Sequence, residues 1–531
     1  MQQFCNYKFW LAFVLLIFTL TLFLIHLIES RYVNLPYLHY SSYENERKNI
    51  IEVEKWLQFG SRIKLTENEE NLNKKLMVLK NQEYEKWQNN VTLRKLNGNF
   101  MKMRPIIQKS LLYNILKIMP KGAALHVHEE ALANTRFLLN LTYEKDLWLC
   151  IDPKTEDYVF LRFSLQQPIA IAGYFNLTCQ WQLLKDLRLV QGHKEIDWKL
   201  KKSFILNSLG EHSRVKLGKI KQLLQGLITF VPVWRKYLAQ TYLECLMDNV
   251  QYLEMRSSLP ELYDLQGNYY TDIVERMDIM RNSSRQMSLQ SGNLYGSKLI
   301  YALTIDYNKT QFDLDLQNAI LLKFFYPDFV IGIDLINDPV LQKNARPLKE
   351  FSSRLLRIQN RLDFYFTTPD LDWHNSKVDA EILESYVLGT KRITFHKALL
   401  RHPYLVTKLA SKNMGIIINP IADQFNHNIA DLRDHPASLL FHYNLPLIIG
   451  SDYPFYWKAD LLTHDFYMVF MYIAPQQGDL KMLKQLAYNS IYYSGLEESK
   501  KLEVWKLWNF LWSHWIDEVN KRLNKLEIEN L

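Results

Sequence analysis

The feature that most restricts the fold of this chain is a series of short apolar segments, separated by stretches with helical spacing of apolar residues. A further short strand is expected after Pro120 and Gly122, which end a helical pattern. Strands that alternate with helices in this way pair in parallel. The pattern therefore predicts an α/β fold, a (β/α)8 or TIM barrel. The apolar segments lie at residues 250–256, 298–305, 329–336, 361–368, 391–395, 414–421 and 445–452.

We assign the barrel to residues 116–531. Two further segments precede it in the sequence, and a third is inserted within it. Residues 31–115 carry apolar residues at helical spacing among many charges, which predicts a helical N-terminal extension. Residues 141–202 are irregular and aromatic, which indicates a surface insertion after the first barrel strand. Residues 1–30 contain a long apolar run and are considered separately.

The apolar run covers residues 9–28 and contains no charged residue. A secretory signal normally has an apolar stretch of about 7–15 residues, whereas about 20 apolar residues can span a bilayer. A cleaved signal peptide and an uncleaved membrane anchor therefore both fit residues 1–30, and both predict a secreted or extracellular location. Five N-x-S/T sequons agree with this location. They lie at Asn90, Asn140, Asn176, Asn282 and Asn308.

The cysteines suggest a disulfide and a core position, and the charge bears on whether the chain binds nucleic acid. Cys150 and Cys179 are close enough in sequence to form a disulfide in an oxidising compartment, and the alternative is that they are buried free thiols. Cys245 lies in an apolar, helical stretch and is expected in the core. The net charge of +8 is modest for 531 residues and no Lys/Arg run stands out, so we expect no nucleic-acid partner.

Two short motifs could carry chemistry. His126 and His128 are two residues apart, so on a strand both imidazoles point to one face and could bind zinc. Asp452 ends a late strand, where barrel enzymes keep catalytic groups. The alternatives are two unrelated histidines and an N-cap aspartate. The chain has no Cys-x-x-Cys, which excludes the zinc deaminases of that signature.

The order of these motifs resembles one family. MPKGAALHVHEEA, VQYLEMR, VLGTKRITFHKALLRHP and IIGSDYPFYWKADLLTHDFYMVF are similar to successive blocks of the adenosine deaminase growth factors, from about residue 100 to the C-terminus. The resemblance implies a barrel with one zinc that deaminates adenosine. It also implies a homodimer formed through residues 31–115, and an insertion at 141–202 that binds a cell-surface receptor or glycosaminoglycan.

Carrying the family's residues onto this chain reveals a degenerate site. By resemblance, His126, His128 and Asp452 are zinc ligands, while Thr367 stands in place of the third zinc histidine. Other substitutions affect catalysis and substrate binding. Asp370 replaces the general-acid glutamate, Phe395 replaces the water-orienting histidine, and Glu129, Asn337 and Tyr453 occupy substrate-binding positions. A neutral hydroxyl is a poor zinc ligand, so we expect weak or absent zinc binding.

Two functional hypotheses follow. The first is an extracellular, growth-factor-like protein that is catalytically inactive and acts by binding. The alternative is a zinc-dependent adenosine deaminase that converts adenosine to inosine with a rearranged, weak site using His396 or Asp370. Losing a general acid or base typically reduces rate by about 10²–10⁴, which favours the first hypothesis. Whether adenosine itself still binds is left open.

Overall fold

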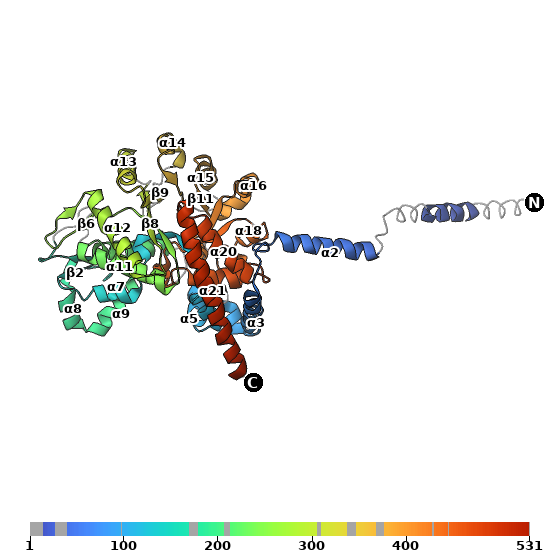
Figure 1. The fold of residues 1–531 in the computed structure, drawn as a ribbon, viewed down its shortest axis with the longest axis horizontal. Helices are drawn as coiled ribbons and strands as arrows, with labels where there is room; N and C mark the ends of the chain where they lie inside the picture. The colour runs from blue at the N-terminus through green and yellow to red at the C-terminus, as the bar shows by residue number, and fades with distance from the viewer. Residues whose placement is uncertain are drawn as a thin grey trace, which may run out of the picture. The chain divides into compact units, whose positions relative to one another are not determined.

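The computed structural model divides into two compact units, Met1–Gln58 and Phe59–Leu531. In the first unit, residues 14–26 are helical, and α2 spans Tyr40–Leu57. The second unit holds everything that follows, and it contains the barrel (Figure 1). The structure describes residues 14–26, 40–96, 98–168, 179–206, 213–304, 309–336, 347–367, 376–426, 429–443 and 445–529.

In the described residues, eight parallel strands form the barrel. The first five pair in the order β1-β5-β8-β9-β10, and the last three in the order β11-β12-β13. Backbone hydrogen bonds join the two sheets: Lys391 donates to Phe364 (2.8 Å), and His128 donates to Asp452 (3.0 Å). The strands are β1 (Ala123–His128), β5 (Tyr252–Ser257), β8 (Gly296–Thr304), β9 (Val330–Ile336), β10 (Asp363–Phe364), β11 (Arg392–Thr394), β12 (Gly415–Ile418) and β13 (Leu447–Ile449). The predicted fold class is confirmed.

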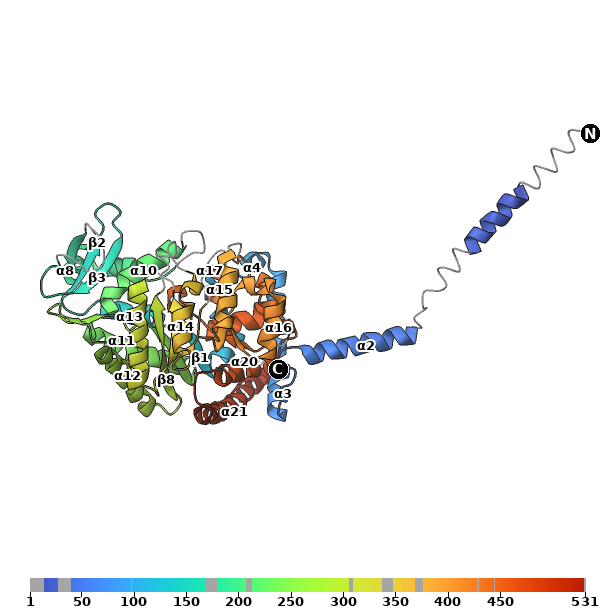
Figure 2. The same cartoon turned by 90° about the horizontal axis from the view of Figure 1, so that it is seen from above.

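Helices surround the strands, as the two views in Figures 1 and 2 show. Because each strand faces a helix on its outer side and the core on its inner side, its sequence is apolar on both faces. The helices that join or follow the strands are α11 (Val231–Met247), α12 (Ile273–Gln290), α13 (Lys309–Phe325), α14 (Ser352–Ile358), α15 (Ser376–Val387), α16 (Pro403–Ser411), α17 (Pro420–Asn426), α18 (Ser438–His442), α19 (Thr463–Met468) and α20 (Leu480–Tyr492).

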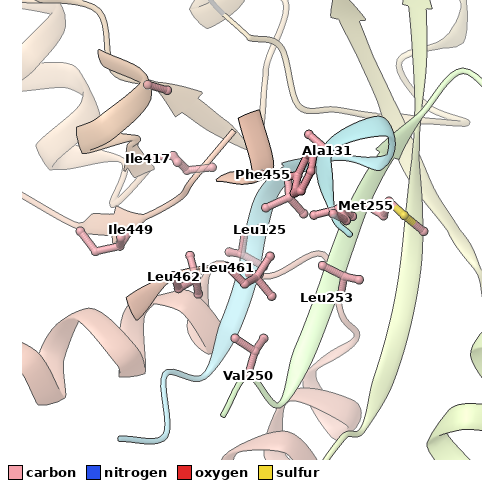
Figure 3. Packing of buried hydrophobic residues seen from close by; sticks show 14 of the residues in the cluster. Leu125, Ala131, Val250, Leu253, Met255, Ile417, Ile449, Phe455, Leu461 and Leu462 are labelled. Atoms are coloured by element: carbon pink, nitrogen blue, oxygen red, sulfur yellow. The ribbon is translucent and has the colours of Figure 1, made fainter. Parts of the chain in front are cut away.

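The core near β1 is built from side chains that are far apart in the sequence. Leu125 of β1 lies among Leu253 of β5 and the pair Leu461 and Leu462 (Figure 3). Leu125, Leu253 and Leu462 are completely buried. Burying one such side chain stabilises the fold by about 1.5–3 kcal/mol. This packing holds β1, and with it the two histidines at its end, in a fixed position.

The insertion after β1 forms a small antiparallel sheet, although its sequence is irregular. It follows α7 (Thr135–Leu141), and its strands pair in the order β3-β2-β4. A disulfide joins Cys150 of β2 to Cys179, with 5.4 Å between the Cα atoms, and confirms that expectation. The insertion's elements are β2 (Leu147–Ile151), β3 (Tyr158–Phe163), β4 (Gln180–Leu183), α8 (Leu184–Gln191) and α9 (His193–Ser203), before α10 (Ser213–Ile228).

The C-terminal helix α21 (Glu498–Glu529) packs against α3 (Glu67–Asn89) and against residues before β1, and its tryptophan stripe, Trp508, Trp512 and Trp515, lies at these contacts. The indole of Trp512 donates to Glu69 (2.7 Å), while Trp508 and Trp515 donate to backbone carbonyls of Pro120 and Ile115. All three indoles are buried, so these tryptophans serve the packing of α21 against the rest of the unit. The other helices before the barrel are α4 (Val91–Leu96), α5 (Phe100–Ile107) and α6 (Leu111–Lys117).

Several sequence features can be placed directly. Cys245 is buried on α11, as expected. Asn90, Asn140 and Asn282 are exposed. None of the helices in the described ranges is long and apolar enough to cross a membrane. Several features lie outside the described residues: residues 9–13 and 27–28 of the apolar run, the sequons at Asn176 and Asn308, and the positions Asn337 and Asp370.

Candidate metal centre

His126, His128 and Asp452 come together where β1 and β13 end. The two histidines project from alternate positions of β1, and the Asp452 carboxylate Oδ1 lies 3.5 Å from His126 Nε2 and 3.3 Å from His128 Nε2. One ligand atom from each residue lies within 4.8 Å of the others. Two imidazoles and one carboxylate at this spacing form a candidate metal site, which we call the triad.

Backbone pairing holds Asp452 against β1. Its amide donates to the carbonyl of His126 (2.9 Å), and its carbonyl accepts from the amide of His128 (3.0 Å). Asp452 adopts φ of +60°, the left-handed region that few non-glycine residues occupy. Such strain persists only where surrounding contacts enforce it, and it is common at functional sites.

The protonation states suit a cation. Burial lowers the pKa of His126 to about 4, with the charge of Arg256 acting in the same direction and Asp452 opposing it. Burial raises the pKa of Asp452, but the two flanking imidazoles outweigh it and hold that pKa well below its usual range. A neutral imidazole and an ionised carboxylate are the forms that bind metals. His126 Nε2 is buried without a hydrogen-bond partner among the described residues, as a ligand atom awaiting a metal would be.

Thr367, just after β10, forms hydrogen bonds with Asp334 and not with the triad residues. Its hydroxyl donates to Asp334 Oδ2 (2.6 Å) and its amide donates to Asp334 Oδ1 (2.7 Å). Asp334, on β9, also forms a buried ion pair with Arg256 of β5, with 2.6 Å between Arg256 Nε and Asp334 Oδ2. Arg256 in turn donates to the carbonyl of Leu125, next to His126. Thr367, which the resemblance assigns to the third-histidine position, therefore takes part in a buried network of the barrel interior.

Phe395 and His396 follow β11. Phe395 is buried, and its ring centroid lies 5.6 Å from that of His435. His396 Nδ1 accepts from the amide of Ala398 (3.1 Å) and caps the short helix at Lys397–Arg401. The hydroxyl of Thr394, the last residue of β11, lies 3.4 Å from His126 Nδ1. Thr394 therefore contacts a triad histidine directly, whereas the next two residues, Phe395 and His396, serve packing and helix capping.

Glu129 and Tyr453 flank the triad. Burial raises the pKa of Glu129 well above its ordinary value, and the charge of Glu130 adds to the effect, so the neutral acid is favoured. The Tyr453 ring stacks on the His128 ring, with centroids 4.4 Å apart and an interplanar angle of 15°. Lys221 of α10 donates to the Tyr453 hydroxyl (3.1 Å) and pairs with Glu130 (2.8 Å).

The partners of these residues are not evident from the local sequence. Asp334 could have been noticed, because it is the one charged residue of the apolar strand VIGIDLI, and Arg256 because it lies with Glu254 on the buried strand YLEMRS; buried charges are rarely without a partner. Lys221 lies on a helix with two other lysines, Lys216 and Lys219, and nothing local distinguishes it. Its role depends on contacts with Glu130 and Tyr453, which are 91 and 232 positions away along the chain (221 − 130 and 453 − 221).

Comparison with known proteins identifies the family. Residues 21–116 match the family described as adenosine/AMP deaminase N-terminal. The chain is 34% identical to an adenosine deaminase of Lutzomyia longipalpis over 91% of this chain and 95% of that protein. It is also 30% identical to human adenosine deaminase 2, over 90% and 94% of the two chains. The chain belongs to the adenosine deaminase growth factor family.

The solved structures agree on the fold of this chain. An amidohydrolase from Burkholderia ambifaria with bound zinc superimposes with a TM-score of 0.51 at 13% identity, covering 77% of this chain and 94% of that one. Its low identity makes it a guide to the fold alone. The fold and family that the sequence motifs predicted are therefore confirmed, while the roles assigned to Phe395, Asp370 and the substrate-binding positions stay predictions.

Proposed function

We propose that this protein is a secreted adenosine deaminase growth factor that deaminates adenosine poorly or not at all, and that it acts by binding. The observation that carries the proposal is the commitment of Thr367 to Asp334, through both its hydroxyl and its amide. A neutral hydroxyl that already donates to a carboxylate is a weak substitute for an imidazole ligand. The phenyl ring of Phe395 has no atom that can accept a proton from water.

The triad nevertheless has the right chemistry for zinc. His126, His128 and Asp452 would hold the ion, since two imidazoles and a carboxylate are common zinc ligands and His126 Nε2 has no other partner in the described part of the chain. When bound there, zinc supplies Lewis-acid activation of water. With three protein ligands where the resemblance implies four, we expect zinc to bind more weakly than in active relatives.

The direct test measures metal and turnover together. The full-length protein is purified with added zinc, its metal content is measured, and conversion of adenosine to inosine is followed beside the Lutzomyia longipalpis adenosine deaminase. We expect less than one zinc per chain after dialysis and a rate at least about 10²-fold lower than that of the relative. Stoichiometric zinc with turnover within about tenfold of the relative would show the proposal to be wrong.

The intact triad favours a second candidate, a zinc-dependent adenosine deaminase with a rearranged site. In that case Asp370 or His396 would carry proton transfer, and D370N or H396Q would abolish a slow activity that the wild type retains. His396 already accepts a hydrogen bond from Ala398, so its use as a base would require that cap to open. Equal, near-background rates in the wild type and both variants would exclude this candidate.

The disulfide and the sequons support secretion. A disulfide between Cys150 and Cys179 persists in oxidising compartments, and the described sequons at Asn90, Asn140 and Asn282 are exposed, as glycosylation requires. Expression in a secreting eukaryotic cell should release protein into the medium that loses mass on treatment with an N-glycosidase. Retention of residues 1–30 in the membrane fraction would instead support the anchor.

We further propose that residues 31–115 mediate a homodimer, and that the 141–202 insertion binds a cell-surface receptor or a glycosaminoglycan. Helix α9 supports glycosaminoglycan binding by the insertion, since Lys194, Lys201 and Lys202 are exposed on it together with Trp198. Heparin chromatography of the wild type and of a K194Q/K201Q/K202Q variant tests the charge contribution. Elution of both at the same salt concentration would exclude this glycosaminoglycan site.

A further inference from the structure

Tyr453 lies where the triad comes nearest to solvent. The side chains of His126, His128 and Asp452 are 1%, 5% and 11% exposed, so a ligand must approach from the side of Asp452 and His128. Tyr453 follows Asp452 directly in the chain and is half-buried. Its ring lies nearly parallel to the His128 ring at stacking distance, with 4.4 Å between centroids. This ring therefore covers a face of His128 on the approach to the triad.

A clamp from two other elements holds the ring there. The ammonium of Lys221, on α10, lies 4.3 Å from the centroid of the Tyr453 ring and also donates to its hydroxyl. Glu130, in the short helix after β1, pairs with the same ammonium at 2.8 Å. Lys221 and Glu130 are 22% and 26% exposed, which places the clamp at the rim of the site. The Tyr456 ring stacks beside Tyr453, with centroids 5.6 Å apart.

A planar heteroaromatic ligand that approached the triad would compete with this ring. Aromatic rings prefer offset-stacked contacts of the kind that Tyr453 already makes with His128, and a second ring cannot occupy the same face. A small ligand such as azide has no ring to stack, so it does not compete with Tyr453 for the face of His128. The clamp by Lys221 and Glu130 makes displacement of Tyr453 less favourable, through a cation–π contact and a hydrogen bond.

We propose that Tyr453 is a specificity-determining residue: clamped over His128 by Lys221 and Glu130, it excludes purine-sized rings from the metal centre. This inference rests on the proposed function in one respect, namely that the triad binds a metal. It goes beyond that proposal because it assigns the exclusion of purines to one side chain and its clamp, independently of Thr367 and Phe395.

The test uses the full-length protein with cobalt(II) at saturating concentration, because the visible absorption of cobalt reports on ligands at the metal. Azide serves as the small probe and purine riboside as the planar probe. We expect Y453A to bind purine riboside about tenfold more tightly than the wild type, with azide affinity unchanged within about twofold. K221M, which removes the clamp and keeps the ring, should give an intermediate gain. Y143A is the matched control, since Tyr143 is similarly clamped by Arg188 and Asp197 in the insertion.

A second measurement needs no metal. Diethyl pyrocarbonate modifies accessible neutral imidazoles, and the rate at which His128 is modified can be followed by peptide mass spectrometry in the metal-free protein. Removing the covering ring in Y453A should raise that rate several-fold over the wild type and Y143A. A wild type that takes up no cobalt would show the metal part of the proposed function to be wrong, and the modification rates would then decide whether Tyr453 shields His128. Cobalt uptake with no gain in purine riboside binding by Y453A would overturn the inference.

Discussion

The triad on the β1–β13 side and the network around Asp334 on the β9–β11 side use their buried polar groups in opposite ways. On the β1–β13 side, His126, His128 and Asp452 converge, and His126 Nε2 has no hydrogen-bond partner in the described ranges. On the β9–β11 side, Thr367 and Arg256 both bond to Asp334, which also accepts from the amide of Leu335.

This difference illustrates two roles that a buried polar group can have. A group whose partners are all within the protein stabilises the fold, whereas a buried ligand atom without a partner carries a desolvation penalty that a bound ion can relieve. The β1–β13 side has kept the second kind of group. The β9–β11 side has only the first kind at Asp334 and Thr367, so we expect its substitutions to affect stability and those at the triad to affect metal binding.

The largest effect is expected from breaking the Arg256–Asp334 pair. D334A would leave the buried Arg256 guanidinium without its partner and should lower the free energy of unfolding by about 3–5 kcal/mol. Urea unfolding followed by tryptophan fluorescence measures this. The matched control is D157A, which breaks the exposed Lys219–Asp157 pair and should change stability by about 0.5 kcal/mol or less. Equal effects of D334A and D157A would contradict a structural role for the β9–β11 side.

Removing a triad ligand should affect metal binding most. H126A is expected to weaken zinc binding by at least about 100-fold, since even partners of the ligating residues contribute about 10–100-fold. Competition with a chromophoric chelator measures the dissociation constant. H193A, at an exposed histidine stacked on Tyr143, should leave zinc binding unchanged. If H126A and H193A bound zinc equally, the triad would not be the metal site.

Thr367 distinguishes the two sides most directly. T367V keeps the shape and the amide hydrogen bond but removes the hydroxyl donor to Asp334. Because that bond is to a charged group, its loss should reduce the free energy of unfolding by about 1.5–3 kcal/mol. Zinc affinity should stay within about twofold of the wild type. A tenfold loss of zinc affinity in T367V would mean that the hydroxyl is a ligand after all.

The smallest expected effect is on the pH dependence of the free energy of unfolding, through a buried glutamate on the β9–β11 side. Glu381 of α15 accepts from the amide of Leu348 (2.9 Å), and burial raises its pKa to about 7. Because the folded pKa lies above the unfolded value, the stabilisation is fully present below about pH 4.5 and is lost as pH rises through 7. E381Q, which cannot ionise, should remove on the order of 1 kcal/mol of this pH dependence. Identical pH profiles of unfolding for wild type and E381Q would contradict the shift.

The local pattern of the sequence was sufficient for much of this protein. Short apolar strands alternating with helices determine the barrel, because each strand must be covered on both faces. The spacing of His126 and His128 determines that they share a face, since a strand repeats every two residues. The tryptophan stripe of α21 follows in the same way from the helical repeat. Each of these properties depends on residues within a few positions of one another.

Only the tertiary structure decided which polar groups are satisfied and which are left for a ligand. The resemblance assigned Thr367 to a histidine position, but its bond to Asp334 and the pairing with Arg256 connect β9 and β5 to a residue just after β10. The clamp of Lys221 and Glu130 on Tyr453 likewise joins three elements that no local pattern relates. The physical reason is that a hydrogen bond or ion pair depends on distances of about 3 Å, which barrel closure sets between residues far apart in the chain.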